Sequence, residues 1–431
     1  MLRDRGKIDR LFYILYFCLH MKFSQYHISD KIKKNLTELG FLKPTDIQYK
    51  SIPSIMKGED VLAIAQTGTG KTAAFAIPIV DRLFAKKRHR ENKSIRCLVM
   101  VPTRELAVQI NEVFSKIAAN TPLKILTTFG GADQTTQIKA LKTGIDILIS
   151  TPGRMFDLRS QGYIDLSETE VLILDEADHM LALGFIKDIQ DVIKHLPRRY
   201  QTLFFSATID EKIKDLAYSI VRNPIRIQLS PKDPVSKNID HQVAYIEMDD
   251  KRFFLERMIR EKEESKMLVF VRTKVRAERL AKAMERVNIK TLTMHGDKHQ
   301  EDRLEVMETF RKGDIRVLIA TDISARGIDI PGIHYVINYD LPDVAENYVH
   351  RIGRTGRGTE RGHALTFCAP EEKPILEIIQ GFLGKEIRQM EIDKSDYRMT
   401  LALTEEVNTN WQKLLDEAAT AKSSKRKKKK K

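Results

Sequence analysis

A glycine-rich turn that ends in a lysine and a threonine stands between an apolar run (61–65) and a stretch of helical length (71–83). Glycines let backbone N–H groups point at phosphate oxygens, the lysine can neutralise the β and γ phosphates, and the threonine hydroxyl can bind Mg²⁺. An ordinary strand-to-helix turn is the alternative, because alanine replaces the first glycine of the general motif. The predicted triphosphate site comprises Ala65, Gln66, Thr67, Gly68, Thr69, Gly70, Lys71 and Thr72.

Two carboxylates, Asp175 and Glu176, directly follow a second apolar run (171–174). The carboxyl end of a parallel strand faces the ligand crevice of such a sheet. Asp175 is therefore expected to hold Mg²⁺ through water, together with Thr72, and Glu176 to orient the attacking water and accept its proton. Acids that merely begin a helix are the alternative, but that would not explain the phosphate-binding turn.

The elements that must position these residues alternate along the chain. Short apolar runs and amphipathic stretches follow one another from 61 to about 228 and again after 241, which is typical of βαβ units around a parallel sheet. Residues 230–240 contain two prolines and no apolar period, which predicts a linker. We expect two α/β domains, 21–229 and 241–395, followed by a helical extension and tail, 396–431.

Charge and cysteine content restrict the partners. The chain carries a formal charge of +14, of which eight positive charges lie in the last ten residues, so we expect a polyanionic partner and a disordered tail. An amphipathic helix is predicted over 401–421, which contains the only tryptophan, Trp411. The three cysteines are far apart, which argues against a disulfide framework and a zinc site and fits a reducing cytoplasm.

Taken together, the motifs resemble those of the DEAD-box RNA helicases over about 21–395, and the basic tail is most similar to the bacterial RhlE type. The resemblance implies two RecA-like domains in tandem that use ATP and Mg²⁺. It also implies a cytoplasmic enzyme that binds single-stranded and duplex RNA without strong sequence preference and unwinds duplexes locally, with hydrolysis driving RNA release. Ribosomal or RNA-decay proteins are candidate partners, and no membrane is expected.

The resemblance assigns further nucleotide contacts in the first domain. Gln48 matches the family's adenine-reading glutamine, and its amide suits the adenine edge. Phe23 occupies the place of the stacking aromatic, with core packing as the alternative. Ser206 and Thr208 resemble the element that couples hydrolysis to strand separation, although this element could also be a helix N-cap.

RNA contacts are expected in both domains by the same resemblance. In the first domain they follow three apolar runs, where backbone amides and hydroxyls suit a sugar-phosphate backbone and capped turns are the alternative. In the second domain Asp329 is assigned to the ribose of the nucleotide. The expected RNA contacts are Pro102, Thr103, Arg104, Gly130, Gly131, Thr151, Gly153, Arg154, Gln300, Arg303 and Thr321.

Three arginines separated by glycines lie at 350–357. Such residues are poor core material but suit triphosphate oxygens, so Arg354 and Arg357 are expected to be catalytic arginine fingers, with a basic nucleic-acid patch as the alternative. Because they follow the linker, ATP and RNA would have to close the domains before the site is complete. A DNA helicase and an RNA-annealing protein with incidental hydrolysis are the rival functions.

The first twenty residues contain an apolar run (11–19) behind four cations and so imitate a signal peptide. The run is far shorter than the ~20 residues that span a bilayer, and no small-residue cleavage site follows it. We interpret residues 1–20 as an extra or non-native extension, with a genuine hydrophobic appendage as the alternative.

Overall fold

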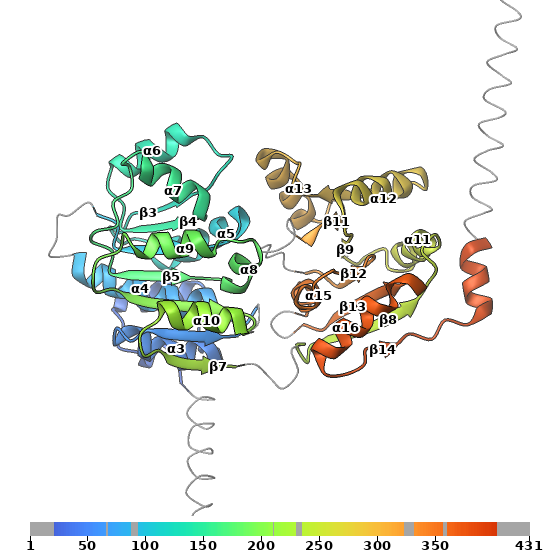
Figure 1. The fold of residues 1–431 in the computed structure, drawn as a ribbon, viewed down its shortest axis with the longest axis horizontal. Coiled ribbons are helices and arrows are strands. Elements are labelled where there is room, and N and C mark those ends of the chain that lie inside the picture. The colour runs from blue at the N-terminus through green and yellow to red at the C-terminus, as the bar shows by residue number, and fades with distance from the viewer. Residues whose placement is uncertain are drawn as a thin grey trace, which may run out of the picture. The chain divides into compact units, whose positions relative to one another are not determined.

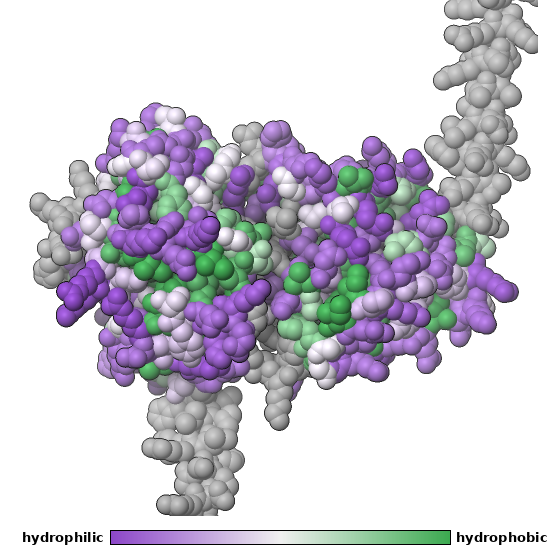
Figure 2. Space-filling model, viewed as in Figure 1, coloured by the Kyte–Doolittle hydropathy of each residue, from purple (hydrophilic) through white to green (hydrophobic). Residues whose placement is uncertain are grey.

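The computed structural model describes residues 21–65, 68–87, 94–209, 211–229, 235–322, 332–356 and 360–402, with only the backbone at 300 and 301. The described chain falls into two compact units that divide between Leu229 and Val235 (Figure 1). Strand β8 begins at Ile239 and so takes up the last two residues of the predicted linker. Polar side chains cover most of the visible face of each unit, with apolar ones among them (Figure 2).

The first unit contains a seven-stranded parallel sheet in the order β3-β4-β2-β5-β6-β1-β7. Strands β1, β2, β4 and β5 are buried at every position, as expected for a parallel sheet covered on both faces. The strands are β1 (Val61–Ile64), β2 (Cys97–Met100), β3 (Ile125–Thr128), β4 (Ile147–Ser150), β5 (Val171–Leu174), β6 (Gln201–Ser206) and β7 (Ile225–Gln228).

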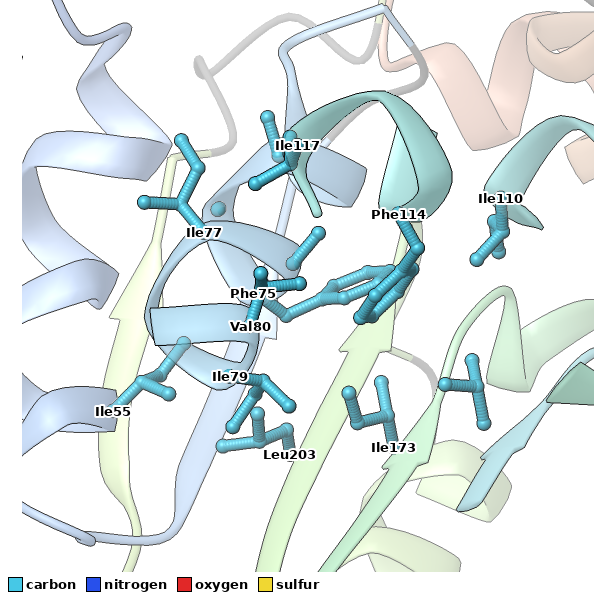
Figure 3. Close-up of a cluster of buried hydrophobic side chains, with 14 of the residues drawn as sticks. Ile55, Phe75, Ile77, Ile79, Val80, Ile110, Phe114, Ile117, Ile173 and Leu203 are labelled. Atoms are coloured by element: carbon cyan, nitrogen blue, oxygen red, sulfur yellow. The ribbon is translucent and has the colours of Figure 1, made fainter. Parts of the chain in front are cut away.

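Helices cover both faces of this sheet. Alternate strand residues point to opposite faces, so Val61 and Ala63 join one apolar core whereas Leu62 and Ile64 join the other. In the first core, Phe75 of α4 packs against Phe114 of α5, with ring centroids 5.9 Å apart (Figure 3). The helices are η1 (Phe23–Gln25), α2 (Asp30–Glu38), α3 (Asp46–Met56), α4 (Lys71–Lys87), α5 (Arg104–Ile117), α6 (Gln134–Lys142), α7 (Pro152–Ser160), α8 (Ala177–Ala182), α9 (Ile186–Ile193) and α10 (Glu211–Ile220).

The second unit repeats this plan with a parallel sheet in the order β10-β11-β9-β12-β13-β8-β14. Its strands are β8 (Ile239–Tyr245), β9 (Met267–Phe270), β10 (Leu292–Met294), β11 (Val317–Ala320), β12 (Tyr335–Asn338), β13 (Gly362–Cys368) and β14 (Arg388–Gln389). Its helices are α11 (Lys251–Glu261), α12 (Lys274–Arg286), α13 (Gln300–Lys312), α15 (Ala345–Ile352), η2 (Pro370–Glu372) and α16 (Lys373–Leu383), and residues 394–402 are also helical.

The predicted fold class, two parallel-sheet α/β domains in tandem, is confirmed. The predictions for residues 1–20, for most of the helix at 401–421 and for the lysine-rich tail lie outside the described residues. Within the described part of the chain, no helix is both long and apolar enough to cross a bilayer.

Candidate functional site

The phosphate-binding turn leaves β1 and enters α4. The backbone N–H of Ala65 donates to the carbonyl of Ser206 at 3.0 Å, which ties the start of the turn to the end of β6. Gly68 and Gly70 have φ values of 80° and 92°, a region that favours glycine. Lys71 is only 6% exposed, and its Nζ has no hydrogen-bond partner among the described residues. Gln66 and Thr67 lie outside the described residues.

Gln48 connects the predicted base-reading element to this turn. Its Nε2 donates to the Gly70 carbonyl at 3.1 Å, and its Oε1 accepts from the Thr45 N–H at 2.9 Å. A Cβ at Gly70 would lie 2.5 Å from Gln48 Nε2, so a side chain there would push the Gln48 amide out of its place. Both ends of the Gln48 amide therefore already make one hydrogen bond within the protein. The second Nε2 proton and the second Oε1 lone pair remain for a nucleotide base.

Phe23 lies in the apolar core and is only 3% exposed. Its ring meets Phe41 edge-on, with centroids 6.2 Å apart, and lies 5.8 Å from Tyr26. These contacts match the core-packing alternative, and its role as a base-stacking residue stays a prediction.

The two candidate catalytic acids follow β5 in different environments. Asp175 is buried, and this burial raises its pKa to about 6, although Lys71 nearby opposes the shift. Glu176 is partly buried and adopts a left-handed conformation, with φ 51° and ψ 49°. This conformation is uncommon for a residue with a side chain and is typical of strained functional sites.

Three features of this site fit Mg²⁺ bound to a nucleotide. Asp175 is buried beside two further acids, Glu176 and Asp178, which raise its pKa against the effect of Lys71, so a divalent cation would be favourable there. The unpartnered Lys71 ammonium suits a phosphate. Magnesium commonly takes one or two protein ligands and fills its other positions with water and phosphate oxygens, so Asp175 with Thr72 is an adequate set.

Asp178 is a site residue to which the sequence analysis gave no role, and its contacts join two of the predicted elements. Its Oδ2 accepts hydrogen bonds from the N–H groups of Ala207 (3.2 Å) and Thr208 (3.1 Å) and from the Thr208 hydroxyl (3.1 Å). The predicted coupling element after β6 is therefore held by the acidic turn after β5. The four-residue run of acids and alanine was the available signal, but the partner lies 30 residues further along the chain.

The sheet order separates the two sets of predicted residues. The phosphate-binding turn, the acidic turn and the predicted coupling element follow β1, β5 and β6, which are adjacent strands, whereas the RNA candidates of this unit follow β2, β3 and β4, which are also adjacent. All seven strands are parallel, so both sets lie at the carboxyl edge of one sheet, in two neighbouring halves.

Arg104 and the two glycines after β3 lie together in the half of the edge that holds the RNA candidates. A Cβ added at Gly131, which has φ 80°, would lie 2.4 Å from Arg104 Nη1, so the guanidinium covers this turn. Thr103 caps α5, because its hydroxyl oxygen accepts from the N–H of Leu106 at 3.3 Å. Pro102 is buried beside this cap.

The turn after β4 is held in a similar way. Thr151 precedes α7, and its N–H donates to the Thr128 carbonyl at 3.2 Å. Arg154 donates to the carbonyl of Ala132 at 3.3 Å and to Oε1 of Gln137 at 3.1 Å, which links α7 to the glycine turn and α6. A Cβ at Gly153 would meet nothing within 4 Å, so this position is open.

The prediction that the arginines at 350–357 lie outside the core was partly wrong. Arg351 is only 2% exposed and forms a bidentate pair with Asp322, at 2.5 and 2.9 Å. The argument that these arginines are poor core material is therefore wrong for Arg351, because a carboxylate and the carbonyl of Asp340 satisfy its guanidinium in the core. Arg354 is also buried, and its Nε donates to the His350 carbonyl at 3.2 Å.

The other predicted residues of the second unit are only partly described. Thr321 and Asp322 follow β11, and Arg303 lies in the first turn of α13. For Gln300 only the backbone, at the start of α13, is described. Asp329 and Arg357 lie outside the described residues.

Each of the two units matches a known protein family. The sequence family described as DEAD/DEAH box helicase matches residues 45–216, and the helicase conserved C-terminal domain matches residues 250–359. The chain is 40% identical to the DEAD-box ATP-dependent RNA helicase CshA of Geobacillus kaustophilus, over 85% of this chain and 78% of that protein. It is 39% identical to the DEAD-box ATP-dependent RNA helicase RhpA of Helicobacter pylori, over 86% of this chain and 74% of that protein.

Solved structures give the same result. The structure of S. cerevisiae Dbp5 bound to RNA and ADP BeF3 matches with a TM-score of 0.78 and 28% identity, over 90% of this chain and 99% of that one. The narrower likeness to the RhlE type stays a prediction. With a phosphate-binding turn, an acidic turn and a coupling element meeting on three adjacent strands, the chain belongs to the DEAD-box ATP-dependent RNA helicases, enzymes that hydrolyse ATP in response to RNA and remodel it.

Proposed function

We propose that the β1, β5 and β6 half of the first sheet hydrolyses ATP and that the β2, β3 and β4 half holds the RNA backbone. The observation that carries this proposal is the buried Lys71 Nζ, which lacks a hydrogen-bond partner among the described residues, near the buried Asp175, since a nucleotide with Mg²⁺ would supply ligands to both groups. Lys71 would bind the β and γ phosphates, and Glu176 would orient the attacking water and accept its proton.

Asp175 and Thr72 would hold Mg²⁺, which when bound neutralises charge on the phosphates. Gln48 would contact the adenine with its remaining donor and acceptor while it fixes Gly70. Arg354 and Arg357 would stabilise charge that develops on the γ-phosphate. Because they belong to the second unit, hydrolysis would require that ATP and RNA draw the two units together, and release of phosphate would free the RNA.

Coupling between the two halves would pass through Asp178. Its three hydrogen bonds hold Ala207 and Thr208, so a change in the acidic turn on hydrolysis would reach the end of β6 directly. We propose that this contact, together with Ser206, transmits the state of the nucleotide to the RNA contacts. RNA would be bound through its backbone, with little dependence on sequence.

RNA-stimulated hydrolysis is the direct test. ATPase activity is measured with single-stranded RNA and with DNA of the same sequence, and we expect stimulation by RNA only. Equal stimulation by DNA would favour a DNA translocase. Lys71→Ala should lose nucleotide binding and stimulation together, because it removes the phosphate countercharge.

An RNA-annealing protein is separated by a second assay. A labelled duplex is mixed with ATP or with a non-hydrolysable analogue, and strand release and strand annealing are followed in the same tube. We expect release with ATP, whereas annealing that is indifferent to ATP would support the rival function.

The lysine-rich tail would add to RNA affinity without contributing to chemistry. Eight full contacts to single-stranded RNA would change the slope of log K against log salt by about 5 to 6, at most. Truncation after Ala421 should therefore flatten the salt dependence and leave the saturated ATPase rate unchanged. We further propose that the enzyme works in the cytoplasm, with ribosomal or RNA-decay proteins as candidate partners.

A further inference from the structure

An apolar pocket of about 300 Å³ lies in the second unit, in a place that the proposed ATP and RNA roles do not use. Its walls come from Phe254 and Met258 of α11 and from Ile392, and its floor from Gln242, Tyr335 and Leu365 of strands β8, β12 and β13. Most of its lining is carbon. Helices normally cover both faces of a parallel sheet, so this pocket is an incompletely covered part of the face.

The described chain ends beside this pocket. Figure 1 shows the last described helix, 394–402, close to α11. Tyr397 packs on Phe254 with ring centroids 4.9 Å apart, and its hydroxyl donates to Asp250 at 2.7 Å. Arg257 donates to the Thr400 hydroxyl at 2.8 Å. Residue 403 therefore leaves from a point that is fixed against one wall of the pocket.

The sequence that follows has the composition of a covering element. Leu403, Val407, Trp411 and Leu414 are spaced so that a helix would present them as one apolar stripe. Trp411 is nine residues beyond 402, a reach of about 14 Å as a helix and about 30 Å when extended. Asp396, six residues before 402, already lines the pocket, so Trp411 is well within range.

We propose that residues 403–415 of this chain fold back on the second unit and insert Trp411 into this pocket. An aromatic side chain of this size buries roughly 150–250 Å² of its surface, and here the indole would complete the cover of the sheet face. The tether favours this occupant over a separate partner, because a short linker gives an effective concentration in the millimolar range. Leu403, Val407 and Leu414 would then pack along α11 and the segment around Ile392.

Tryptophan fluorescence tests the proposal directly, because Trp411 is the only tryptophan in the chain. In the full-length protein we expect emission at shorter wavelength than in the urea-unfolded chain, with acrylamide quenching reduced several-fold. Met258→Glu puts a charge in the wall, and Gln242→Phe fills the floor, so each should return emission and quenching towards the unfolded values. Ile378→Glu, at a 65% exposed position on α16, is the matched control and should change neither. Circular dichroism melting establishes that each variant is folded.

Three results would overturn the proposal. The native chain could show the emission and quenching of the unfolded chain. Folded Met258→Glu and Gln242→Phe proteins could both keep the native emission. The blue shift could appear only as protein concentration rises, which would assign the pocket to a second copy. The RNA and ATP assays are independent of this outcome.

Discussion

The two halves of the first sheet's carboxyl edge are built in opposite ways. In the proposed ATP half, Lys71 Nζ is buried and has no hydrogen-bond partner in the part of the chain that the structure describes, and Asp175 is buried with a raised pKa. In the RNA half, Thr103 and Arg154 already make hydrogen bonds within the protein. One half is therefore incomplete until a charged ligand arrives, whereas the other is a preformed shape. Substitutions in the first should change chemistry, and substitutions in the second should change both RNA binding and stability.

Glu176→Gln should have the largest effect. It removes the proposed base and keeps the shape of the turn, so kcat should fall by about 10² to 10⁴-fold while ATP and RNA binding are retained. Steady-state ATPase and equilibrium binding of a fluorescent nucleotide give the two quantities. Glu112→Gln, at an exposed position of α5, is the control. A near-normal kcat for Glu176→Gln would remove this residue from the chemistry.

Asp175→Asn should abolish activity and yet stabilise the ligand-free protein. A pKa raised from 3.8 to about 6 means that the folded state holds its proton more tightly, so stability falls as pH rises from about 4 to 6. The variant avoids this loss, which at pH 7 amounts to at most about 3 kcal/mol. Urea unfolding at pH 4 to 8 measures the difference, which should vanish near pH 4.

Asp133 is the matched control for that experiment, because its pKa is shifted in the opposite direction. Asp133 caps α6, and its hydrogen bonds with Thr136 hold its pKa below the ordinary value. Asp133→Asn should therefore not stabilise the protein at pH 7. A stabilisation in both variants, or in neither, would contradict the contrast between the two halves.

Arg104→Ala and Arg154→Ala should separate binding from scaffolding within the RNA half. Loss of a charge-assisted phosphate contact is worth about 1.5–3 kcal/mol, so Arg104→Ala should weaken RNA binding by roughly ten- to a hundredfold. Arg154→Ala should also lower the free energy of unfolding, by about 1–3 kcal/mol, because it leaves Ala132 and Gln137 without their donor. RNA titration measures the affinity of each variant and urea unfolding its free energy of unfolding. ATP binding should be unchanged in both variants.

Gln48→Ala should have the smallest effect, a narrower preference for ATP over GTP with a few-fold higher KM for ATP. The first change follows from loss of the base contact and the second from loss of the bond to Gly70. The ratio of kcat/KM for the two nucleotides measures the first. Lys139→Ala, at an exposed position of α6, is the control. If only KM changes, Gln48 positions the turn and does not read the base.

Much of the fold could be predicted from the sequence, because central parallel strands are continuous apolar runs. Strands β2 and β5, for example, are buried at every position. The edge strands β7 and β14 are largely exposed, so their composition carries no such signal. The spatial order of the strands could not be derived from their order along the chain, so the sequence did not show that the ATP candidates and the RNA candidates lie on two separate groups of strands.

Within the site, local motifs were readable and long-range partners were not. The glycines and Lys71 indicate a phosphate-binding turn within a segment of seven residues, 66–72. By contrast, Asp178 meets Thr208 across 30 positions, and Arg351 meets Asp322 across 29. An isolated arginine gives no sign of which carboxylate the fold brings to it, so its burial could not be foreseen.

Because Arg104 lies against Gly131, the effect of a substitution at one of these positions should depend on the residue at the other. A Cβ at Gly131 would lie 2.4 Å from Arg104 Nη1, so the flexible guanidinium would have to move away, and the backbone there, with φ 80°, disfavours a side chain as well. Once Arg104 has been replaced by alanine the collision is gone, and only the backbone cost remains. In a library that varies both positions, the double variant should therefore lose less activity than the two single variants predict together. Replacement of Arg104 during evolution would then make substitutions at Gly131 easier to tolerate.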